Sequence, residues 1–337
     1  PDAPTPKALK RYLGQFLMDR RIVEIPRFIW CWVLHCIILV FRPKKSAEKY
    51  AAIWTPEGSP LMVNAQKQKQ LFNAFLSQRI ASPFAVELGM SYGNPSMASA
   101  IAKLKAQHCT KILVFPLYPQ YAASSTAASL DAIWKVLLKT RNVPAIRTIR
   151  NYHDHPAYIQ ALANSILEHW ASNGKPEKLV MSFHGVPKVH LLKGDPYHCE
   201  CHVTARLLAQ RLGLTRDQYH VTFQSRFGKA KWLEPYTEPT VRSLAQQGLK
   251  RLDVVCPGFT SDCLETLEEI AMEVKQAFLT EGGESFQYIP CLNAEPRWIE
   301  ALAQLVRQHT AGWPMQAPAA AALDASRAAA LALGAPD

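Results

Sequence analysis

Short β-rich runs alternate with helical patterns along most of this 337-residue sequence, and this alternation constrains the fold more than any other feature. The β-rich runs cover residues 85–92, 111–117, 145–150, 178–183, 218–225, 251–256 and 285–292. Helical patterns lie near residues 95–107, 124–138, 156–171, 196–212, 238–248, 262–280 and 295–309. Strand–helix alternation of this length predicts an α/β fold, in which helices cover both faces of parallel sheets.

The segment at residues 171–176 contains glycine and proline near the middle of the chain, and it is the best candidate for a domain boundary. We predict two doubly wound domains with a cleft between them. The N-terminal domain covers residues 1–170 and is joined by a helix near residues 295–315, whereas the C-terminal domain covers residues 171–294. In such sheets, ligands bind beyond the carboxyl ends of the strands. Residues 316–337 are rich in alanine and are predicted to form a poorly ordered tail or a loose helix.

An apolar run occupies residues 28–41, between Arg27 and Arg42, and only His35 interrupts it. As a helix the run is about 21 Å long, whereas the hydrocarbon core of a bilayer is roughly 30 Å thick, so a membrane span is not expected. The run is either a buried core helix or a helix on a membrane surface, with Lys44 and Lys45 adding to the flanking charge.

Composition and missing motifs exclude several classes of protein. Lys and Arg number 38 against 27 Asp and Glu, and the net charge of +11 favours an anionic partner: nucleic acid, an acidic membrane surface or a small molecule with carboxylates. The eight cysteines form no CxxC pair, which argues against a zinc ribbon and favours a reducing compartment. The Walker A, GxGxxG, GxSxG and HExxH motifs are all absent, so the common nucleotide, hydrolase and zinc-protease sites are not expected.

The β-rich run at residues 178–183 leads directly into His184, and Gly185 and Pro187 then force a turn. An imidazole in this position lies at the edge of the sheet where ligands bind, and it serves as a base or as a metal ligand. From the residues alone, the alternative is a histidine that only forms a hydrogen bond with a neighbouring loop.

Acidic residues recur on the helical pattern that follows residues 251–256. At about 100° per residue, Asp262, Glu265, Glu269 and Glu273 form one stripe, opposite the apolar residues of the same helix. The stripe is either the solvated face of an amphipathic helix or a lining of the cleft that passes a cation or protons along it.

Aromatic and hydroxyl residues follow two further strands. Residues 111–115 lead to Tyr118, and residues 219–225 lead to Arg226 and Trp232. Such residues suit a flat, apolar ligand with polar edges. A group formed by His198, Cys199, Cys201 and His202 would suit a soft metal, although the turn that precedes it favours surface residues.

Several segments of the sequence resemble those of the ferrochelatase family, whose members insert ferrous iron into protoporphyrin IX to make protohaem. The resemblance extends from about residue 5 to residue 307 and rests on the combination of its motifs. The motifs are Phe16-Leu-Met-Asp19 with Ile25-Pro26, Gly58-Ser-Pro60, Tyr118-Pro-Gln-Tyr121, Ser182-Phe-His-Gly-Val-Pro187, Gly194-Asp-Pro-Tyr197, Phe223-Gln-Ser-Arg-Phe-Gly228, Trp232-Leu-Glu-Pro-Tyr-Thr237 and Pro257-Gly-Phe-Thr-Ser-Asp-Cys-Leu-Glu-Thr-Leu267.

The resemblance implies two Rossmann-like domains with the porphyrin between them. It identifies His184 and Glu265 as the catalytic pair and as the residues that meet the metal, and we expect Asp262 and Glu269 to assist them. The positions that the resemblance assigns to substrate binding are Arg42, Tyr50, Ser59, Tyr118 and Trp232.

The resemblance further implies a lyase of haem biosynthesis whose partners are protoporphyrin IX and Fe²⁺, with no role for nucleic acid. We expect a cytoplasmic protein that contacts the inner membrane from its surface, where a hydrophobic porphyrin would approach. The contact would be made by the run at residues 28–41 together with Tyr12, Leu13, Phe16 and Leu17. Basic neighbours would add attraction to anionic lipid.

Two features depart from the family pattern. Some relatives carry a two-iron, two-sulfur cluster on C-terminal cysteines and one cysteine near Tyr121. Here Ala123 fills that position and no cysteine follows Cys291, so no iron–sulfur cluster is expected. Family members also begin with a strand that ends in a Leu-Gly-Thr-Pro-like turn, and Pro1 resembles the proline of that turn, so the first strand is expected to be missing.

The chemistry of metalation agrees with these residue types. Two pyrrole protons leave and a dication arrives, which requires a base and carboxylates. Basic residues such as Arg42 suit the propionates, and apolar walls that favour a bent macrocycle would stabilise the transition state. Two rivals remain: a chelatase for another metal or tetrapyrrole, such as coproporphyrin or a cobalt substrate, and a porphyrin-binding protein without catalysis.

Overall fold

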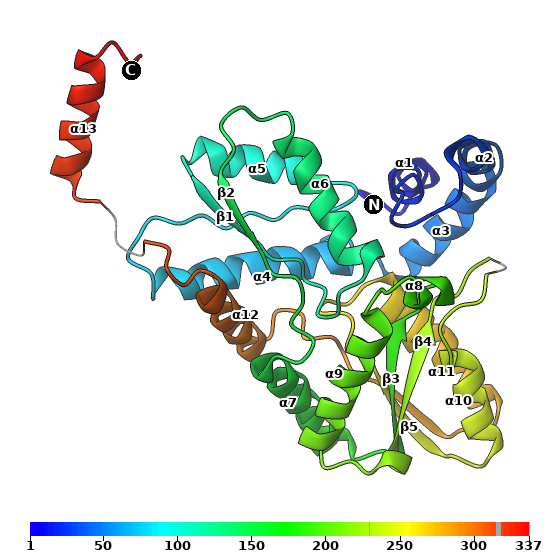
Figure 1. The fold of residues 1–337 in the computed structure, drawn as a ribbon. Helices are drawn as coiled ribbons and strands as arrows, with labels where there is room; N and C mark the ends of the chain where they lie inside the picture. The colour runs from blue at the N-terminus through cyan, green and yellow to red at the C-terminus, as the bar shows by residue number, and fades with distance from the viewer. Residues whose placement is uncertain (229, 315–317, 337) are drawn as a thin grey trace.

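The computed structural model describes residues 1–228, 230–314 and 318–336, and two parallel sheets organise them (Figure 1). The smaller sheet pairs β1 (Lys111–Val114) with β2 (Ala145–Thr148). The larger has the strand order β4-β3-β5-β6. Its strands are β3 (Lys178–His184), β4 (Tyr219–Gln224), β5 (Arg251–Val255) and β6 (Ser285–Tyr288), all paired in parallel. The predicted α/β fold with parallel sheets is confirmed.

Helices cover both faces of the larger sheet, as Figure 1 shows. Side chains alternate along β3, so Met181 and Phe183 join one core and Val180 joins the other. The first core includes α7 (Pro156–Asn173) and α9 (Tyr197–Arg211). The second includes α10 (Thr237–Gln246), the π-helix η4 (Glu265–Val274) and α11 (Lys275–Thr280). Two short helices, α8 (Lys188–Leu192) and the 3₁₀ helix η3 (Arg216–Gln218), lie in the connections.

The smaller sheet packs against α5 (Met97–Ala106) and α6 (Ala128–Leu137), and the π-helix η2 (Ala123–Ala127) leads into α6. Helix α12 (Pro296–His309) packs on both α4 (Pro60–Ser77) and α7, so the end of the chain returns to the N-terminal half. Beyond it, α13 (Ala320–Ala332) extends away from the rest of the molecule with all its residues exposed (Figure 1). The tail was expected to be loose or helical; residues 316, 317 and 337 of it lie outside the described part.

The strand expected at residues 85–92 does not form. This segment is half-buried, and no backbone hydrogen bond joins residues 84–89 to another part of the described chain. Strand β1 pairs with β2 and not with this segment. The apolar composition of residues 85–92 favours a strand. A strand also requires a partner at hydrogen-bonding distance, and residues 84–89 have no such backbone partner among the described residues.

The N-terminal helices form a separate apolar cluster. It contains α1 (Pro6–Leu17), α2 (Arg27–Val33), the π-helix η1 (Leu34–Ile38) and α3 (Leu39–Ile53). Leu13 and Leu17 are buried against Trp30 and Leu34, and the Trp30 indole N–H donates to the Leu17 carbonyl at 2.6 Å. Leu13 and Leu17 are thus core residues and do not contribute to an outer face, contrary to the sequence prediction.

The apolar run at residues 28–41 is only half buried, so its interpretation as a buried core helix is wrong. Every third or fourth residue packs inward, and the remaining residues point to solvent. Phe28 is 81% exposed and Phe41 is 71% exposed. The exposed apolar residues of the run are Phe28, Ile29, Trp32, Ile37, Val40 and Phe41, hereafter the apolar surface. Among the described residues, no helix combines the length and apolar character needed to cross a membrane.

Candidate active site

His184 is the last residue of β3, at the carboxyl edge of the larger sheet. Its Nδ1 lies 2.6 Å from the carbonyl oxygen of Gly185. A carbonyl can only accept a hydrogen bond, so we assign the hydrogen to Nδ1 and the free lone pair to Nε2. The ring is half-buried and its centroid lies 6.4 Å from that of Phe259. The alternative from the sequence was a hydrogen bond to a neighbouring loop, whereas the partner is the carbonyl of the next residue, and this contact leaves Nε2 free.

Gln224 joins the end of β3 to the acidic helix. It pairs in register with His184 on the adjacent strand β4. Its buried side-chain oxygen accepts the Ser182 hydroxyl at 2.7 Å. Its side-chain nitrogen donates to the carbonyl of Glu265 at 2.7 Å and to the carboxylate of Glu269 at 3.3 Å. The sequence did not single out Gln224, because its only signal was its place in a strand-end motif.

Glu269 lies beside His184 and is held by the residue after Gln224. One carboxylate oxygen accepts the backbone N–H of Ser225 at 2.7 Å, and the other accepts the Ser225 hydroxyl. Burial raises the pKa of Glu269, while the Ser225 hydrogen bond and the charge of His184 act in the opposite direction. A buried carboxyl group beside an imidazole is suited to exchanging protons with it.

Glu265 precedes Glu269 by four residues, at the start of η4, and it faces tyrosines from the N-terminal helices. Burial raises the pKa of Tyr12 and of Tyr50, and the negative charge of Glu265 raises both further. These phenols therefore remain protonated. The charge of Glu265 thus acts on the two phenols and that of His184 acts on Glu269, while Gln224 joins the two glutamates; His184 comes from β3, the glutamates from η4 and the phenols from α1 and α3.

Asp262 does not belong to this group, and here the sequence prediction is corrected. Its side-chain oxygens accept the Tyr288 hydroxyl at 2.5 Å, the Cys291 N–H at 3.2 Å and the Asn293 amide at 2.6 Å. Asn293 in turn accepts the backbone N–H of Asp262 at 2.8 Å. The carboxylate therefore braces the loop that follows β6.

The single acidic stripe also does not form. Residues 265–274 wind as a π-helix, which has a wider turn than the 100° geometry assumes. Glu273 is exposed and pairs with Lys49 at 2.9 Å, whereas Glu269 is held at Ser225. The alternative of a fully solvated acidic face is equally wrong, because Asp262 is buried and Glu265 and Glu269 are half-buried.

Arg42 and Trp232 lie on either side of an exposed aromatic residue, Phe227. The Arg42 guanidinium is 5.6 Å from the centroid of the Phe227 ring, and the Trp232 ring is 5.0 Å from it. Trp232 is buried and packs against Gly185, where an added Cβ would come within 3.1 Å of the indole ring and 2.7 Å of the Gln224 carbonyl. The glycine after His184 is therefore required by close packing.

The other residues predicted to bind substrate are Tyr50, Ser59 and Tyr118. Tyr118 is 40% exposed, in the loop after β1. Tyr50 lies edge-on to Trp54, with ring centroids 6.4 Å apart. The Ser59 hydroxyl accepts the Met62 N–H at 3.3 Å and so forms the N-cap of α4. The substrate-binding role of these residues stays a prediction.

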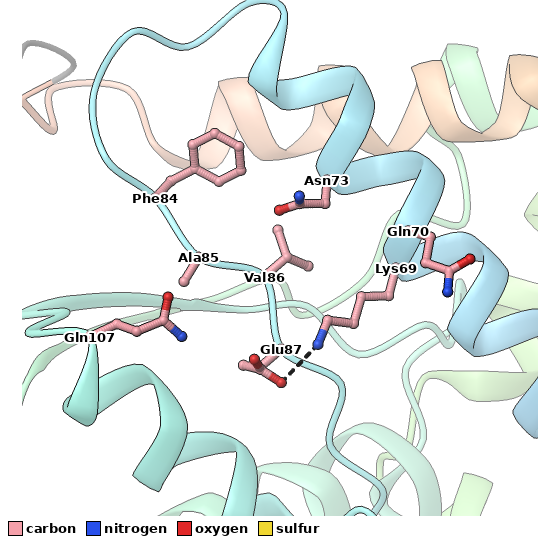
Figure 2. Close-up of a pocket in the computed structure, with 8 residues that line it drawn as sticks. All are labelled: Lys69, Gln70, Asn73, Phe84, Ala85, Val86, Glu87 and Gln107. Atoms are coloured by element: carbon pink, nitrogen blue, oxygen red, sulfur yellow. Dashed lines mark hydrogen bonds and ion pairs between the residues drawn. The ribbon is translucent and has the colours of Figure 1, made fainter.

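A cavity of about 380 Å³ lies between α4 and the extended segment near residue 86 (Figure 2). Its one carboxylate, Glu87, is paired with Lys69 at 2.9 Å. A second cavity of about 380 Å³ lies beside His202 and Arg216. None of the residues predicted for the active site lines either cavity. Neither cavity is therefore the cleft that the sequence predicts.

The described residues contain no group of three or more His, Cys, Asp or Glu side chains spaced to hold a metal ion. In the group near residue 200, Cys201 is buried while Cys199 is exposed, and only the rings of His198 and His202 approach, at 4.5 Å between centroids. Catalytic metals are usually retained by three protein ligands, so an imidazole with one carboxylate would hold a metal only weakly.

Three comparisons place this geometry among known proteins. The family model described as "Ferrochelatase" matches residues 1–310. The chain is 58% identical to the ferrochelatase of Methylobacillus flagellatus over 313 residues, which is 93% of this chain and 91% of the relative. It is also 58% identical to the ferrochelatase of a Polaromonas species over 337 residues, which is 100% of this chain and 92% of the relative.

A solved structure supports the fold. SirB from Bacillus subtilis with Fe³⁺ superposes with a TM-score of 0.54 and covers 75% of this chain and 92% of that chain. The sequence identity is 16%, so the likeness concerns the architecture alone.

Proposed function

The chain belongs to the ferrochelatase family, and from this premise we propose how its own residues carry out the reaction. The protein is a metal chelatase, a lyase of haem biosynthesis that inserts Fe²⁺ into protoporphyrin IX and releases two pyrrole protons. The alternatives, a chelatase for another metal or tetrapyrrole and a non-catalytic porphyrin carrier, are not favoured.

His184 is the base that takes the pyrrole protons. The hydrogen bond from Nδ1 to Gly185 leaves the lone pair on Nε2. A fixed tautomer at the end of a central strand needs no reorientation when the porphyrin binds, which lowers the entropic part of the barrier. This oriented lone pair is the observation that carries the proposal.

Glu265 and Glu269 act with His184 on the protons and on the incoming metal. Glu265 and Nε2 of His184 first hold Fe²⁺ loosely enough for the pyrrole nitrogens to take it, and Nε2, once the ion has left it, accepts the two pyrrole protons in turn. Glu269, whose pKa is raised by burial, receives protons from His184. Gln224 keeps both glutamates in place through its side-chain amide.

The macrocycle is held by aromatic and basic groups from the N-terminal helices, the loop after β1 and the segment after β4. Arg42 pairs with a propionate, because a guanidinium forms strong, charge-assisted hydrogen bonds with a carboxylate. Tyr50, Tyr118 and Trp232 supply the apolar wall, and Ser59 supplies a hydroxyl at its edge. Walls that fit a bent ring better than a flat one would expose the pyrrole lone pairs and so favour the transition state.

The decisive experiment is anaerobic incubation of the purified protein with Fe²⁺ and protoporphyrin IX, followed by the absorbance spectrum. The four Q bands of the free porphyrin should be replaced by the two bands of the metalloporphyrin. Coproporphyrin and Co²⁺ in parallel reactions test the rival chelatases. Porphyrin binding without any spectral conversion would instead indicate a carrier.

We further propose that the protein carries no iron–sulfur cluster, because Ala123 replaces the loop cysteine and residues 292–337 contain no cysteine. Protein purified without oxygen should lack acid-labile sulfide and cluster absorbance. Stoichiometric sulfide would contradict this expectation.

The apolar surface suggests a peripheral membrane contact, and with it a cytoplasmic location at the inner membrane. Its exposed aromatic residues are flanked by Arg27, Lys44 and Lys45. A helix with an apolar outer face and basic neighbours binds at the boundary between headgroups and acyl chains. Protoporphyrin, whose macrocycle is apolar although its propionates are charged, would then reach the site from the lipid.

A further inference from the structure

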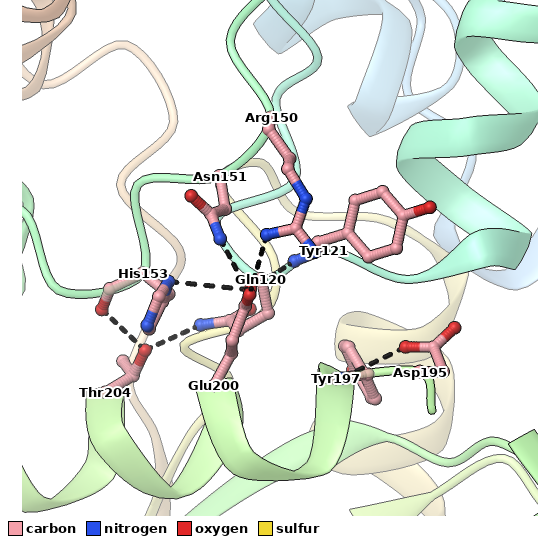
Figure 3. A network of polar contacts seen from close by, with 9 residues as sticks. All are labelled: Gln120, Tyr121, Arg150, Asn151, His153, Asp195, Tyr197, Glu200 and Thr204. Carbon is pink, nitrogen blue, oxygen red and sulfur yellow. Dashed lines mark hydrogen bonds and ion pairs between the residues drawn. The ribbon is translucent and has the colours of Figure 1, made fainter. Parts of the chain in front are cut away.

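The loop that follows β1 carries Tyr118 and is held in place from the other sheet. Helix α9 packs on the larger sheet, and its side chains reach across to the backbone of this loop (Figure 3). These contacts are made by residues that have no role in the proposed reaction and none implied by the family resemblance.

Glu200, on α9, makes the central contact. Its carboxylate is almost fully buried and accepts the backbone N–H of Tyr121 at 2.7 Å. It also accepts the Asn151 amide at 2.7 Å and lies 3.4 Å from Arg150 and 3.4 Å from the Nδ1 of His153 (Figure 3). A buried carboxylate among several donors is costly to remove or neutralise, so its position in the fold is well determined.

Two further residues of the same region hold the loop. Asp195 accepts the backbone N–H of Ala123 at 2.7 Å. Thr204, one turn after Glu200 on the same face of α9, accepts the Gln120 amide at 2.9 Å. Together with the bond between Tyr121 and Glu200, these contacts fix the loop at residues 120, 121 and 123.

Helix α9 is itself fixed to the strand that carries His184. Tyr197 and Cys201 lie in the same buried core as Phe183, which directly precedes His184. His198 stacks on Phe223 of β4, with ring centroids 5.8 Å apart. The position of the loop relative to His184 is therefore set through α9.

We propose that Glu200 is a positioning residue for porphyrin binding, which it serves by holding the Tyr118 loop at a fixed distance from His184. The proposal rests on the proposed function, in which Tyr118 contacts the macrocycle. Glu200 touches neither substrate, so its effect must pass through the loop.

The carboxylate is specifically required because each of its oxygens accepts a short hydrogen bond, one from the Tyr121 N–H and the other from the Asn151 amide. A glutamine at this position would keep one acceptor oxygen but turn its amide group towards the N–H of Tyr121 or the amide of Asn151. One of these donors would lose its partner, and the loop would be released while α9 kept its apolar packing.

The test compares Glu200→Gln with Tyr118→Ala and with the double variant. We expect Glu200→Gln to raise the KM for protoporphyrin about fivefold, with kcat changed less than about twofold and the KM for Fe²⁺ unchanged. We expect the double variant to resemble the stronger single variant, because both changes remove the same contact. Porphyrin affinity without iron, from quenching of tryptophan fluorescence, should follow the same order.

Glu177→Gln is the matched control. Its carboxylate also accepts two backbone N–H groups, from Lys250 at 3.0 Å and Arg251 at 2.7 Å, but at the amino end of the sheet. This variant should leave both KM values unchanged even if it melts at a lower temperature. Should Glu200→Gln fail to fold, Asp195→Asn loosens the same loop at Ala123 and should raise the same KM.

Unchanged porphyrin KM and affinity in folded Glu200→Gln, or effects that multiply in the double variant, would overturn the proposal. A wild-type protein that binds porphyrin without inserting iron would refute the proposed function instead. In that case the affinity measurements alone still decide the role of Glu200.

Discussion

The two sides of the candidate site are built differently. On the side of the larger sheet, hydrogen bonds hold the reactive residues: His184 to the Gly185 carbonyl, the Glu265 backbone carbonyl to Gln224, and the Glu269 carboxylate to Gln224 and Ser225. On the side of the N-terminal helices, the apolar surface and the guanidinium of Arg42 are exposed.

The difference separates two tasks. Groups that move protons must be placed to within a fraction of an ångström, so they lie at strand ends and are held by other side chains. Groups that receive a large apolar substrate need accessible surface. We therefore expect substitutions on the sheet side to change kcat, and substitutions on the helix side to change binding.

The largest effect is expected for His184→Ala. Loss of the base should lower kcat at least 100-fold, since general base catalysis typically contributes about 10²–10⁴-fold. The measurement is anaerobic Fe²⁺ insertion, with circular dichroism to show that the fold is intact. His35→Ala is the control, because His35 also bonds a backbone carbonyl through Nδ1, at 2.9 Å, but lies in the apolar run. Substantial turnover by a folded His184→Ala protein would remove His184 from the mechanism.

Glu265→Gln should lower kcat by about 10–100-fold while porphyrin still binds, because the substitution keeps the shape and removes the charge that meets Fe²⁺. Glu269→Gln should have a milder effect, of a fewfold, since Glu269 lies behind His184. Glu273→Gln, at the exposed end of the same helix, serves as the control. If Glu265→Gln stays within about twofold of wild type at saturating substrates, roughly 0.4 kcal/mol in the barrier, His184 works without it.

The sequence predicts the structure of the sheet side of the site better than that of the helix side. The strands at residues 178–184 and 251–255 and the placement of His184 follow from local pattern, because a strand end and its turn are encoded by adjacent residues. The strand at residues 85–92 fails because pairing depends on a distant partner. The apolar run at residues 28–41 was ambiguous because helical periodicity identifies the face that packs inward, but it does not show whether the opposite, equally apolar face contacts protein or lipid.

The polar networks could not be predicted for a related reason. Asp262 and Glu269 lie in one helical pattern, yet one braces the loop after β6 and the other meets Ser225. Their roles depend on a π-helical turn and on partners more than 25 positions away, neither of which leaves a periodic signal. Glu200 likewise occupies an ordinary helix position in the sequence, and only the fold places the Tyr121 backbone beside it.

A stability effect is expected inside the larger sheet. Asp253, on β5, is buried and accepts the Trp170 indole N–H at 2.9 Å. Burial raises the pKa of Asp253 to about 6. Because this folded-state pKa lies above the unfolded value, the contribution of Asp253 to stability is fully present below the unfolded pKa of 3.8 and is lost as the pH rises through about 6.

Asp253→Asn should therefore stabilise the protein above about pH 7 by up to roughly 3 kcal/mol, since the pKa is raised from 3.8 to about 6 and a shift of one pKa unit corresponds to about 1.4 kcal/mol. The amide oxygen can still accept from Trp170. Denaturant unfolding of both proteins at about pH 4.5 and about pH 7.5 measures the effect, and the advantage of the variant should shrink at the lower pH. An equal difference at both values would show that packing, and not ionisation, is responsible.

Substitutions in the apolar surface are expected to have the smallest effect on catalysis and the clearest effect on membrane binding. Phe28 and Trp32 lie on the apolar surface, 81% and 63% exposed. Replacing both by serine should lower the affinity for anionic vesicles about tenfold or more, because apolar area that would enter the lipid is lost. Flotation at low ionic strength measures this, and salt should weaken the binding of the wild type by screening its basic residues.

The matched control is Leu138→Ser with Val143→Ser, which removes apolar side chains of comparable exposure, 86% and 52%, at the far end of α6. This control should float like the wild type. With porphyrin dispersed in detergent, the Phe28 and Trp32 variant should turn over at nearly the wild-type rate, because the sheet side that moves the protons is untouched. With porphyrin supplied in vesicles, its rate should fall together with its binding. If the wild type does not float with anionic vesicles even at low salt, the apolar surface does not serve to bind lipid, and the helix side must receive porphyrin from water.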